Sequence, residues 1–195
     1  MTLAARHFYL IRHGETEANV ADVVAGHIDS PLTAKGRAEA SAAADIVNQL
    51  ALKPSVIIHS HLSRARDTAA GLNRDLQLPM HEHPGVAERN FGDWHGMALA
   101  EMRPLRAAGH EPPNGETLST FYNRVQAAFT EILNDYSAPV LVVSHGGVFN
   151  ALGQPYGMEF HARNCQLYEF VPGGEAWDVW IYDLSGDGKT RRNKR

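Results

Sequence analysis

Residues 8–14 read FYLIRHG, an apolar run that ends in arginine, histidine and glycine. Residues 140–147 read VLVVSHGG and follow the same plan. A short apolar run that stops at polar turn residues is typical of a buried β-strand. Because ligands in open α/β sheets bind beyond the carboxyl ends of the strands, these two segments predict both a fold class and the place of a site.

Further strands and helices alternate along the chain. Strands are expected at residues 55–59, 166–171 and 177–182, the last two around a Gly173-Gly174 turn. Helices are predicted at residues 34–52, 63–76, 98–105 and 116–136, and a short one is expected to begin within residues 144–147. Thr33 and Ser63 are the expected N-caps of the first two helices. This alternation is typical of the α/β class and predicts a three-layer α/β/α sandwich with a mostly parallel central sheet.

Length and composition favour a single globular domain. The chain has 195 residues, of which 44% are hydrophobic, and this is enough for a sizeable core. We expect one domain over residues 1–184 and a basic, flexible tail over residues 185–195. Five of the last seven residues are basic, so residues 1–188 hold 13 basic against 22 acidic residues. Such an acidic body is a poor nucleic-acid binder, and no nucleic-acid partner is expected.

Cysteine content and the N-terminal sequence bear on location. Cys165 is the only cysteine, so an internal disulfide is impossible and a reducing compartment is favoured. The first residues contain no apolar run long enough for a secretion signal or a membrane span. We therefore expect a cytoplasmic protein with no membrane partner. The oligomeric state stays open between monomer and dimer.

Cationic and imidazole side chains gather at the predicted strand ends. Arg12 and His13 follow the first strand, His145 follows the strand at residues 140–144, and Arg64 begins the helix after residues 55–59. Helix N-termini and guanidinium groups both favour anions. The pattern therefore predicts a pocket for a dianionic, tetrahedral ligand such as a phosphoryl group.

Five sequence blocks resemble a known family. LIRHGETEAN at residues 10–19 is similar to the signature of the histidine phosphatase superfamily, the phosphoglycerate mutase-like proteins. The other four blocks follow in the family's order. They are residues 26–36, an arginine block at 60–68, an acid-bearing loop at 88–96 and a second histidine block at 143–147. The resemblance implies the fold already expected from the alternation of strands and helices.

The resemblance also implies a role for each matching residue. His13 is expected to become phosphorylated, and Glu88 to donate a proton to the leaving group. The residues expected to hold the phosphoryl group are Arg12, Asn19, Gly26, Arg64, His145 and Gly146. Two guanidinium groups and a histidine suit the charge on phosphoryl oxygens, so no metal or other cofactor is expected. The same positive charge is expected to keep His13 unprotonated.

These roles predict a metal-independent phosphomonoesterase that hydrolyses a phosphorylated small molecule through phosphohistidine. One alternative is a phosphotransferase of the phosphoglycerate mutase type. Such mutases carry a longer insertion that excludes water, and only residues 90–116 are available here, which favours hydrolysis. Another alternative is a non-catalytic binder of phosphorylated ligands, which would not need both a nucleophile and an acid. The physiological substrate is left open.

Two positions depart from the family's pattern. His61 stands where the family usually has proline, and His95 stands where it usually has a second glutamate. Both are expected to border the pocket entrance and to affect substrate choice. For Glu88, the residues alone leave open an ordinary surface ion pair with the neighbouring Arg89.

Two histidine pairs invite a metal-site interpretation. His59 and His61 are two residues apart, and so are His81 and His83, which places each pair on one face of a strand. Neither pair has a cysteine or carboxylate at a spacing typical of zinc ligands. We therefore expect no zinc or nickel site.

Overall fold

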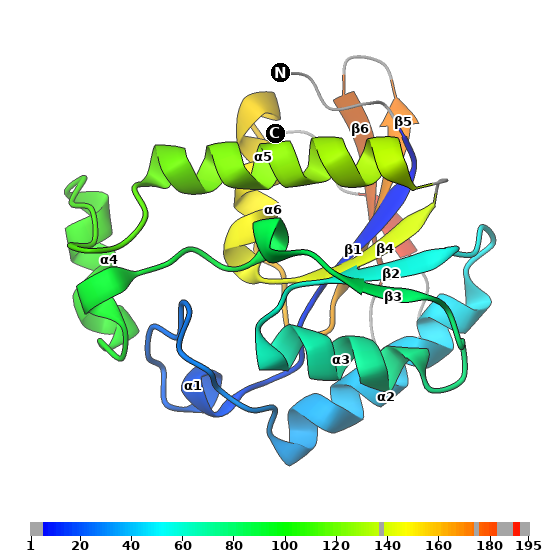
Figure 1. Cartoon of the computed structure of the whole chain (residues 1–195), viewed down its shortest axis with the longest axis horizontal. Helices are drawn as coiled ribbons and strands as arrows, with labels where there is room; N and C mark the ends of the chain where they lie inside the picture. The colour runs from blue at the N-terminus through cyan, green and yellow to red at the C-terminus, as the bar shows by residue number, and fades with distance from the viewer. Residues whose placement is uncertain (1–5, 137–138, 174–175, 183–188, 192–195) are drawn as a thin grey trace.

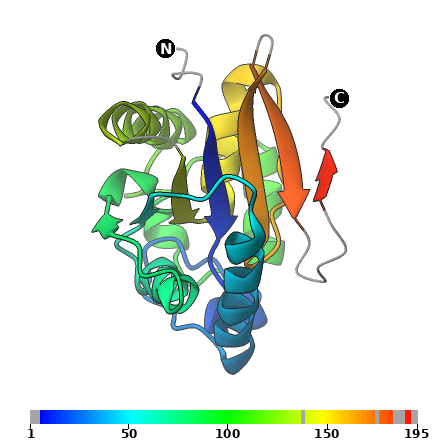
Figure 2. The ribbon, with the colours of Figure 1, turned by 90° about the vertical axis from the view of Figure 1, so that its right-hand side faces the viewer.

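The computed structural model describes residues 6–136, 139–173, 176–182 and 189–191. Its strands form one seven-stranded sheet in the order β3-β2-β4-β1-β5-β6-β7. The strands are β1 (Phe8–Arg12), β2 (Val56–His59), β3 (Met80–Glu82), β4 (Val140–Ser144), β5 (Leu167–Gly173), β6 (Ala176–Tyr182) and β7 (Lys189–Arg191). Strands β1 to β4 are mutually parallel, and each step from β1 through β5 and β6 to β7 is antiparallel (Figure 2). Five strands therefore run in one direction, because β6 points the same way as β1, and the expected mostly parallel sheet is confirmed.

Six α-helices accompany the described strands. They are α1 (Glu17–Val20), α2 (Ala34–Gln49), α3 (Ser63–Asn73), α4 (Leu99–Ala107), α5 (Leu118–Asp135) and α6 (Gly146–Gly153). Three short 3₁₀ helices span Pro84–Val86, Gly92–Trp94 and Gln154–Tyr156. No helix in the described ranges has both the length and the apolar character that crossing a membrane requires.

Alternation along β1 explains why helices cover both faces of the sheet. Phe8 and Leu10 point to one face and pack with α5 and α6, whereas Tyr9 and Ile11 point to the other and pack with α2 and α3 (Figure 1). All four side chains are fully buried. A parallel strand covered on both faces is apolar throughout, which is the pattern read in FYLI. The three-layer sandwich is confirmed.

Most of the expected helix boundaries hold to within a few residues. Thr33 is the N-cap of α2, and its hydroxyl accepts a hydrogen bond from the Gly36 N–H at 3.0 Å. The expectation of Ser63 as N-cap is wrong, because Leu62 holds that position and Ser63 is the first helical residue. The Ser63 hydroxyl donates instead to Asp29, across to the loop that precedes α2.

Helix α4 lies apart from the sandwich, on the side of the molecule where β1 ends (Figure 1). It has a small core of its own, in which Met102 packs with Val24, Phe91 and Trp94. An isolated β-bridge between Val23 and Ala98 ties the start of α4 to the chain after α1. This arrangement places α4 as a wall beside the carboxyl ends of β1 and β4.

Part of the expected tail is described. Residues 189–191 form β7, paired with the edge of β6, while residues 185–188 and 192–195 lie outside the described residues. Gly174 of the expected Gly173-Gly174 turn also lies outside them.

Candidate active site

The two His-Gly turns meet because β1 and β4 are neighbouring parallel strands. Arg12 pairs in register with Ser144, so the residues that follow them leave the sheet together. The His13 N–H continues the ladder and donates to the Ser144 carbonyl oxygen at 2.9 Å. The ring centroids of His13 and His145 are 5.1 Å apart. The place of the site at this edge of the sheet follows from the strand order.

The ring of His13 is held in one orientation and one tautomer. Its Nδ1 lies 2.8 Å from the Gly14 carbonyl oxygen, which only accepts, so Nδ1 carries the proton and donates. The Nε2 of the neutral ring therefore keeps its lone pair. The side-chain amide of Asn164 donates to the His13 carbonyl oxygen at 2.9 Å and fixes the backbone behind the ring.

The electrostatic surroundings keep the His13 ring neutral. Burial lowers its pKa well below the ordinary value, and the positive charges of Arg64 and Arg12 lower it further. The sequence predicted the effect of the two arginines, but burial is the larger cause. A neutral imidazole with a free Nε2 is a nucleophile near neutral pH.

The two arginines are held from behind by backbone carbonyl groups. Arg64 is 1% exposed, and its two terminal nitrogens donate to the carbonyl oxygens of Ile28 at 3.1 Å and Gly26 at 2.7 Å. Arg12 donates to the Ala162 carbonyl oxygen at 2.9 Å. Burial lowers the pKa of both guanidinium groups and the Glu88 carboxylate opposes this, so both stay charged at neutral pH.

Several buried nitrogen atoms of the site have no partner among the described residues. These atoms are Nε of Arg12, Nε of Arg64 and both ring nitrogens of His145. Burial, and then the charge of Arg64, lower the pKa of His145 well below its usual value, so its neutral ring offers one N–H donor. Buried polar groups are usually paired. Donors left over from three different elements around one nucleophile are suited to the oxygens of a phosphoryl group.

Glu88 faces the start of α6. Its Oε2 accepts a hydrogen bond from the Gly147 N–H at 3.1 Å, and its Oε1 accepts from the Arg89 backbone N–H at 2.9 Å. The Arg89 side chain is buried and binds Glu111 and the Glu116 carbonyl oxygen. The alternative of a surface ion pair between Glu88 and Arg89 is therefore not what the structure shows.

A cavity of about 460 Å³ joins these groups. Seven of the eight residues expected from the sequence line it, namely Arg12, His13, Asn19, Gly26, Arg64, Glu88 and Gly146. The eighth, His145, is fully buried and is not among the lining residues, but its ring centroid lies 5.1 Å from that of His13. The structure thus brings all eight together, although their roles in binding and catalysis are a separate question taken up below.

Sequence reasoning missed a second group of lining residues. These side chains come mostly from α4, α5 and the segment before β5, and include Arg103, Arg106, Leu99, Met102, Phe121, Tyr122, Phe160 and His161. It also missed His27, whose Nε2–H donates to the Glu88 carbonyl oxygen at 2.7 Å. The position of His27 inside the block at residues 26–36 was the available signal.

The expectation for His61 and His95 needs correction. Neither lines the cavity. The His61 ring packs edge-on against His27, with 5.8 Å between centroids. His95 lies behind the turn at Gly26, and its Nε2 accepts from the backbone N–H groups of His27 and Phe91. Both residues support the wall of the site from outside.

One histidine of each pair is engaged in a local hydrogen bond. Nδ1 of His59 donates to the Ser60 carbonyl oxygen at 2.9 Å, and Nδ1 of His83 accepts from the Gly85 N–H at 3.0 Å. Within the described ranges, no group of three or more His, Cys, Asp or Glu residues is arranged to hold a metal ion.

Comparison with known proteins shows the family of the chain. Residues 8–182 match the histidine phosphatase superfamily (branch 1), and the chain belongs to this superfamily. A phosphatase of Bacillus subtilis, PhoE, whose function is uncharacterised, is 32% identical over 183 residues, covering 90% of this chain and 93% of that protein. The adenosylcobalamin/alpha-ribazole phosphatase of Salmonella typhimurium is 35% identical, covering 74% and 76%.

Other relatives extend the range of activities. A 2,3-bisphosphoglycerate-dependent phosphoglycerate mutase of Bartonella henselae is 32% identical, covering 75% of this chain and 79% of the mutase. Among solved structures, a mycobacterial glucosyl-3-phosphoglycerate phosphatase in complex with VO3 superposes with a TM-score of 0.76 at 25% identity, covering 91% of this chain and 98% of that one. The family thus includes both phosphatases and mutases.

Proposed function

We propose that this protein is a phosphomonoesterase that hydrolyses a phosphorylated small molecule through a phosphohistidine on His13. The observation that carries the proposal is the neutral His13 ring, with Nδ1 bound to Gly14 and Nε2 free, beside buried and unpartnered nitrogens of Arg12, Arg64 and His145. A nucleophile and an anion clamp in one cavity fit phosphoryl transfer better than binding alone.

In the first step, Nε2 of His13 attacks phosphorus and the P–O ester bond breaks. The leaving oxygen takes a proton from the Glu88 carboxyl, which faces the cavity from the side of α6. The charge of the transferred group is spread over its three equatorial oxygens. Arg12, Arg64 and His145 stabilise these oxygens through the donors that have no other partner.

In the second step, water attacks the phosphohistidine and the N–P bond breaks. The Glu88 carboxylate formed in the first step accepts the proton of this water, so it ends protonated as it began. Inorganic phosphate leaves and His13 returns to its neutral form. Two guanidinium groups and a histidine supply the charge stabilisation, and on that basis we propose that turnover needs no metal ion.

Hydrolysis is preferred over mutase chemistry because the segment at residues 90–116 is short. This segment contains α4 and forms one wall of the cavity. The Bartonella mutase keeps phosphoglycerate isomerisation as the second candidate. The two differ in whether water or a second substrate takes the phosphoryl group. Incubation with 3-phosphoglycerate and a small amount of 2,3-bisphosphoglycerate, which supplies the first phosphoryl group to the histidine, separates them, because a mutase forms the 2-isomer whereas a phosphatase releases inorganic phosphate.

We further propose a cytoplasmic enzyme that acts on small molecules and not on nucleic acid. Its support is a single buried, free cysteine and the acidic balance of residues 1–188. The proposed domain covers residues 1–184, and residues 185–195 are a basic tail of which residues 189–191 pair with β6.

The test is the release of phosphate from an aryl phosphate ester, in the presence of EDTA, by the wild type and by His13→Ala. We expect turnover by the wild type and none by the variant, because removing the nucleophile abolishes the covalent route. His81→Ala is a matched control, since His81 is exposed and does not line the cavity. Turnover that survives His13→Ala would refute the covalent mechanism, and turnover lost to EDTA would refute metal independence.

A further inference from the structure

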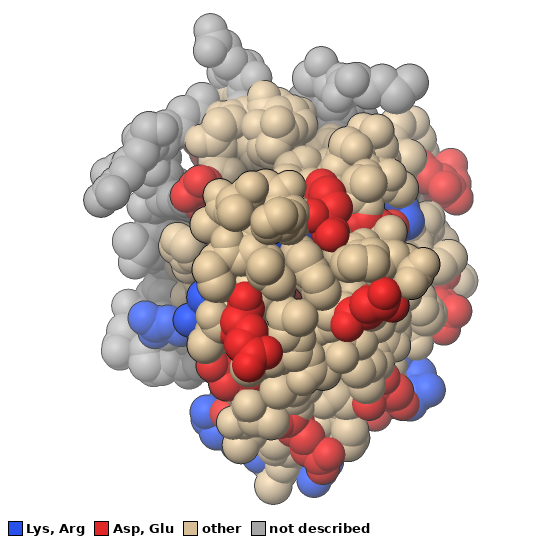
Figure 3. Space-filling model, turned by 90° about the vertical axis from the view of Figure 1, so that its left-hand side faces the viewer, with Lys and Arg blue, Asp and Glu red and all other residues tan. Residues whose placement is uncertain are grey.

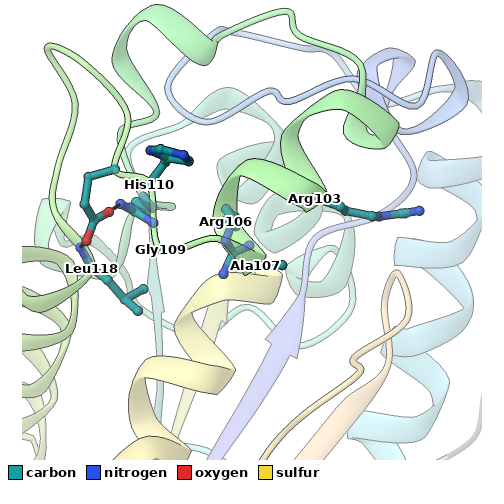
Figure 4. A pocket seen from close by; sticks show the side chains of 8 residues that line it. Arg103, Arg106, Ala107, Gly109, His110 and Leu118 are labelled. Atoms are coloured by element: carbon teal, nitrogen blue, oxygen red, sulfur yellow. Dashed lines mark hydrogen bonds and ion pairs between the residues drawn. The ribbon is translucent and has the colours of Figure 1, made fainter.

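The cavity around His13 extends to a second cluster of positive charge. Arg103 and Arg106 project from α4 and line the same cavity as Arg12, His13 and Arg64. They are three positions apart, so they lie on one face of the helix. An adjoining hollow of about 390 Å³ is lined by the same two arginines together with Arg89 and His110 (Figure 4). None of the five sequence blocks includes Arg103 or Arg106.

These two arginines are not used by the fold. Both are exposed, and neither forms an ion pair or a hydrogen bond within the described part of the chain. Arg89 is different, because its buried guanidinium group is bound by Glu111 and by the Glu116 carbonyl oxygen. Glu111 lines the adjoining hollow, and Arg106 contributes to the lowered pKa of its carboxyl, but its two oxygens are bound by Arg89 and by the Leu118 N–H and it forms no ion pair with Arg106. The charges of Arg103 and Arg106 are therefore available to a ligand.

Much of the remaining cavity wall is apolar. Val24 and Leu99 line it from the α4 side, and Phe121 and Phe160 line it from the α5 side and from the segment before β5. A wall of this kind favours the neutral part of a ligand, while a few polar groups fix its ends. The cavity thus offers cationic groups on two separate elements, at the strand ends and on α4, and an apolar surface in addition.

The surrounding surface does not attract anions in general. The face of the molecule that carries α4 shows mostly acidic and uncharged side chains (Figure 3). The chain as a whole has a formal net charge of −4. Positive charge in the cavity is therefore a local feature, and this distinguishes it from a broad basic patch.

We propose that Arg103 and Arg106 form a second anion subsite, and that the preferred substrate is a phosphomonoester with a second anionic group on a neutral stem. The second group is a phosphate or a carboxylate, since a guanidinium group binds either anion through two parallel hydrogen bonds. The inference rests on the proposed function, because His13 and its clamp receive the phosphate that is hydrolysed. It adds the class of substrate that this particular chain selects.

The experiment compares alkanediol monophosphates with the bisphosphates and ω-carboxyalkyl phosphates of the same chain length, over a series of lengths. We expect the wild type to show a higher kcat/KM for the doubly anionic compounds at one range of lengths, mainly through a lower KM. In the double variant Arg103→Ala and Arg106→Ala, this preference is expected to fall roughly tenfold or more. The phosphate and carboxylate arms show which second group is bound better.

Arg66→Ala and Arg74→Ala together form the matched control. Both arginines are exposed on or just after α3, and each is paired with the aspartate that follows it. The control removes the same charge from another surface, and the preference is expected to stay unchanged. A wild type without preference at any length, or an equal loss of preference in the control, overturns the proposal. Circular dichroism checks that α4 is intact, and alanine favours helix.

Binding measured without turnover separates this proposal from the proposed function. Calorimetry on His13→Ala compares the same compounds when hydrolysis is blocked. A preference that is present in His13→Ala and lost after adding the two α4 substitutions supports the subsite, whatever the fate of the phosphatase proposal. Absence of that preference in His13→Ala overturns the subsite even if the wild type hydrolyses aryl phosphates.

Discussion

The side chain of His95 holds the backbone of His27. Its Nε2 accepts a hydrogen bond from the His27 N–H at 3.1 Å and a second one from the Phe91 N–H at 3.2 Å. The carbonyl oxygen of Gly26, the residue before His27, accepts a hydrogen bond from Arg64, and the His27 ring donates to the Glu88 carbonyl oxygen. One short turn therefore positions both an arginine of the proposed phosphate clamp and the proposed acid.

Replacing His95 tests this turn. His95→Ala leaves two backbone N–H groups without their acceptor, and we expect a loss of about 1–3 kcal/mol in the free energy of unfolding. The value of kcat/KM is expected to fall as well, because Arg64 and Glu88 lose their support. Urea denaturation and steady-state kinetics measure the two effects.

His95→Glu is the matched variant for that test, because a carboxylate also accepts N–H hydrogen bonds. We expect it to restore much of the stability and activity that His95→Ala loses. If His95→Ala is as stable and as active as the wild type, the turn does not depend on His95. If glutamate fails to rescue while alanine is impaired, the ring itself and not its acceptor atom is what matters.

Glu88→Gln tests the proton donor. Glutamine keeps the shape of the side chain but cannot donate a carboxyl proton, so we expect kcat/KM, which reports cleavage of the ester and not hydrolysis of the phosphohistidine, to fall by about 10²- to 10⁴-fold on alkyl phosphates. The loss should be much smaller on an aryl phosphate with an acidic leaving group, which needs little protonation. Rates measured over a series of leaving groups give the comparison. An equal loss on all esters would mean that Glu88 positions the substrate and donates no proton.

The two glycines at the start of α6 differ in the space around them. A Cβ on Gly147 would overlap the Glu88 carboxylate, whereas a Cβ on Gly146 would have Arg12 Nε as its nearest neighbour at 3.8 Å. The atom displaced by Gly147→Ala is at the end of a flexible side chain, so we expect only a small loss of stability. We expect kcat/KM to fall by about 100-fold, because the Glu88 carboxylate is moved. Gly146→Ala is the matched comparison and is expected to lose less. Steady-state kinetics and thermal melts of the two variants measure these effects. A larger loss of activity in Gly146→Ala than in Gly147→Ala would contradict this account of Glu88.

Stability is expected to decrease in acid. The pKa values of His13 and His145 are lowered in the folded chain by burial, and those of His61 and His95 are lowered as well. Below pH about 6.5 the unfolded chain therefore binds more protons than the folded one, and the free energy of unfolding falls as the pH drops. One such histidine contributes a slope of at most about 1.4 kcal/mol per pH unit. Denaturation curves over this range measure the slope, which should be shallower in His145→Gln, and an unchanged slope would show that His145 titrates normally.

The sheet and the grouping of side chains around His13 could be predicted from the sequence because both depend on short-range signals. The apolar runs before His13 and His145 mark strands that are buried on both faces, and Thr33 marks a helix start by its own hydroxyl. Neighbouring parallel strands then place the two histidines together without any knowledge of the loops.

The features that were missed depend on tertiary contacts. Strand β3 has only three residues, and His81 and Glu82 are exposed, so it lacks the alternation that marks a strand. Strand β7 is equally short and exists by pairing with β6. The expected cap at Ser63 failed because its hydroxyl binds Asp29, which is far away in sequence.

The lining residues of α4 were missed for a similar reason. The residue pattern predicts a helix at residues 98–105, but it does not predict that this helix lies apart from the sandwich and faces the cavity. That placement depends on Met102 packing with Phe91 and Trp94, and on the bridge between Val23 and Ala98. A spacing of three residues between Arg103 and Arg106 is common in helices and marks no function by itself.

The position of β1 affects how the protein is made. Although β1 precedes the other described strands in the sequence, it lies in the interior of the sheet, and its partners β4 and β5 come late in the chain. Until those partners emerge from the ribosome, the apolar residues of the FYLI segment have no neighbouring strands to pair with and stay exposed to water. Exposed apolar strands are prone to aggregate. Pairings between such distant segments also slow folding. His13 and His145 meet only when β1 pairs with β4, so recovered activity in a refolding experiment marks the formation of this long-range pairing.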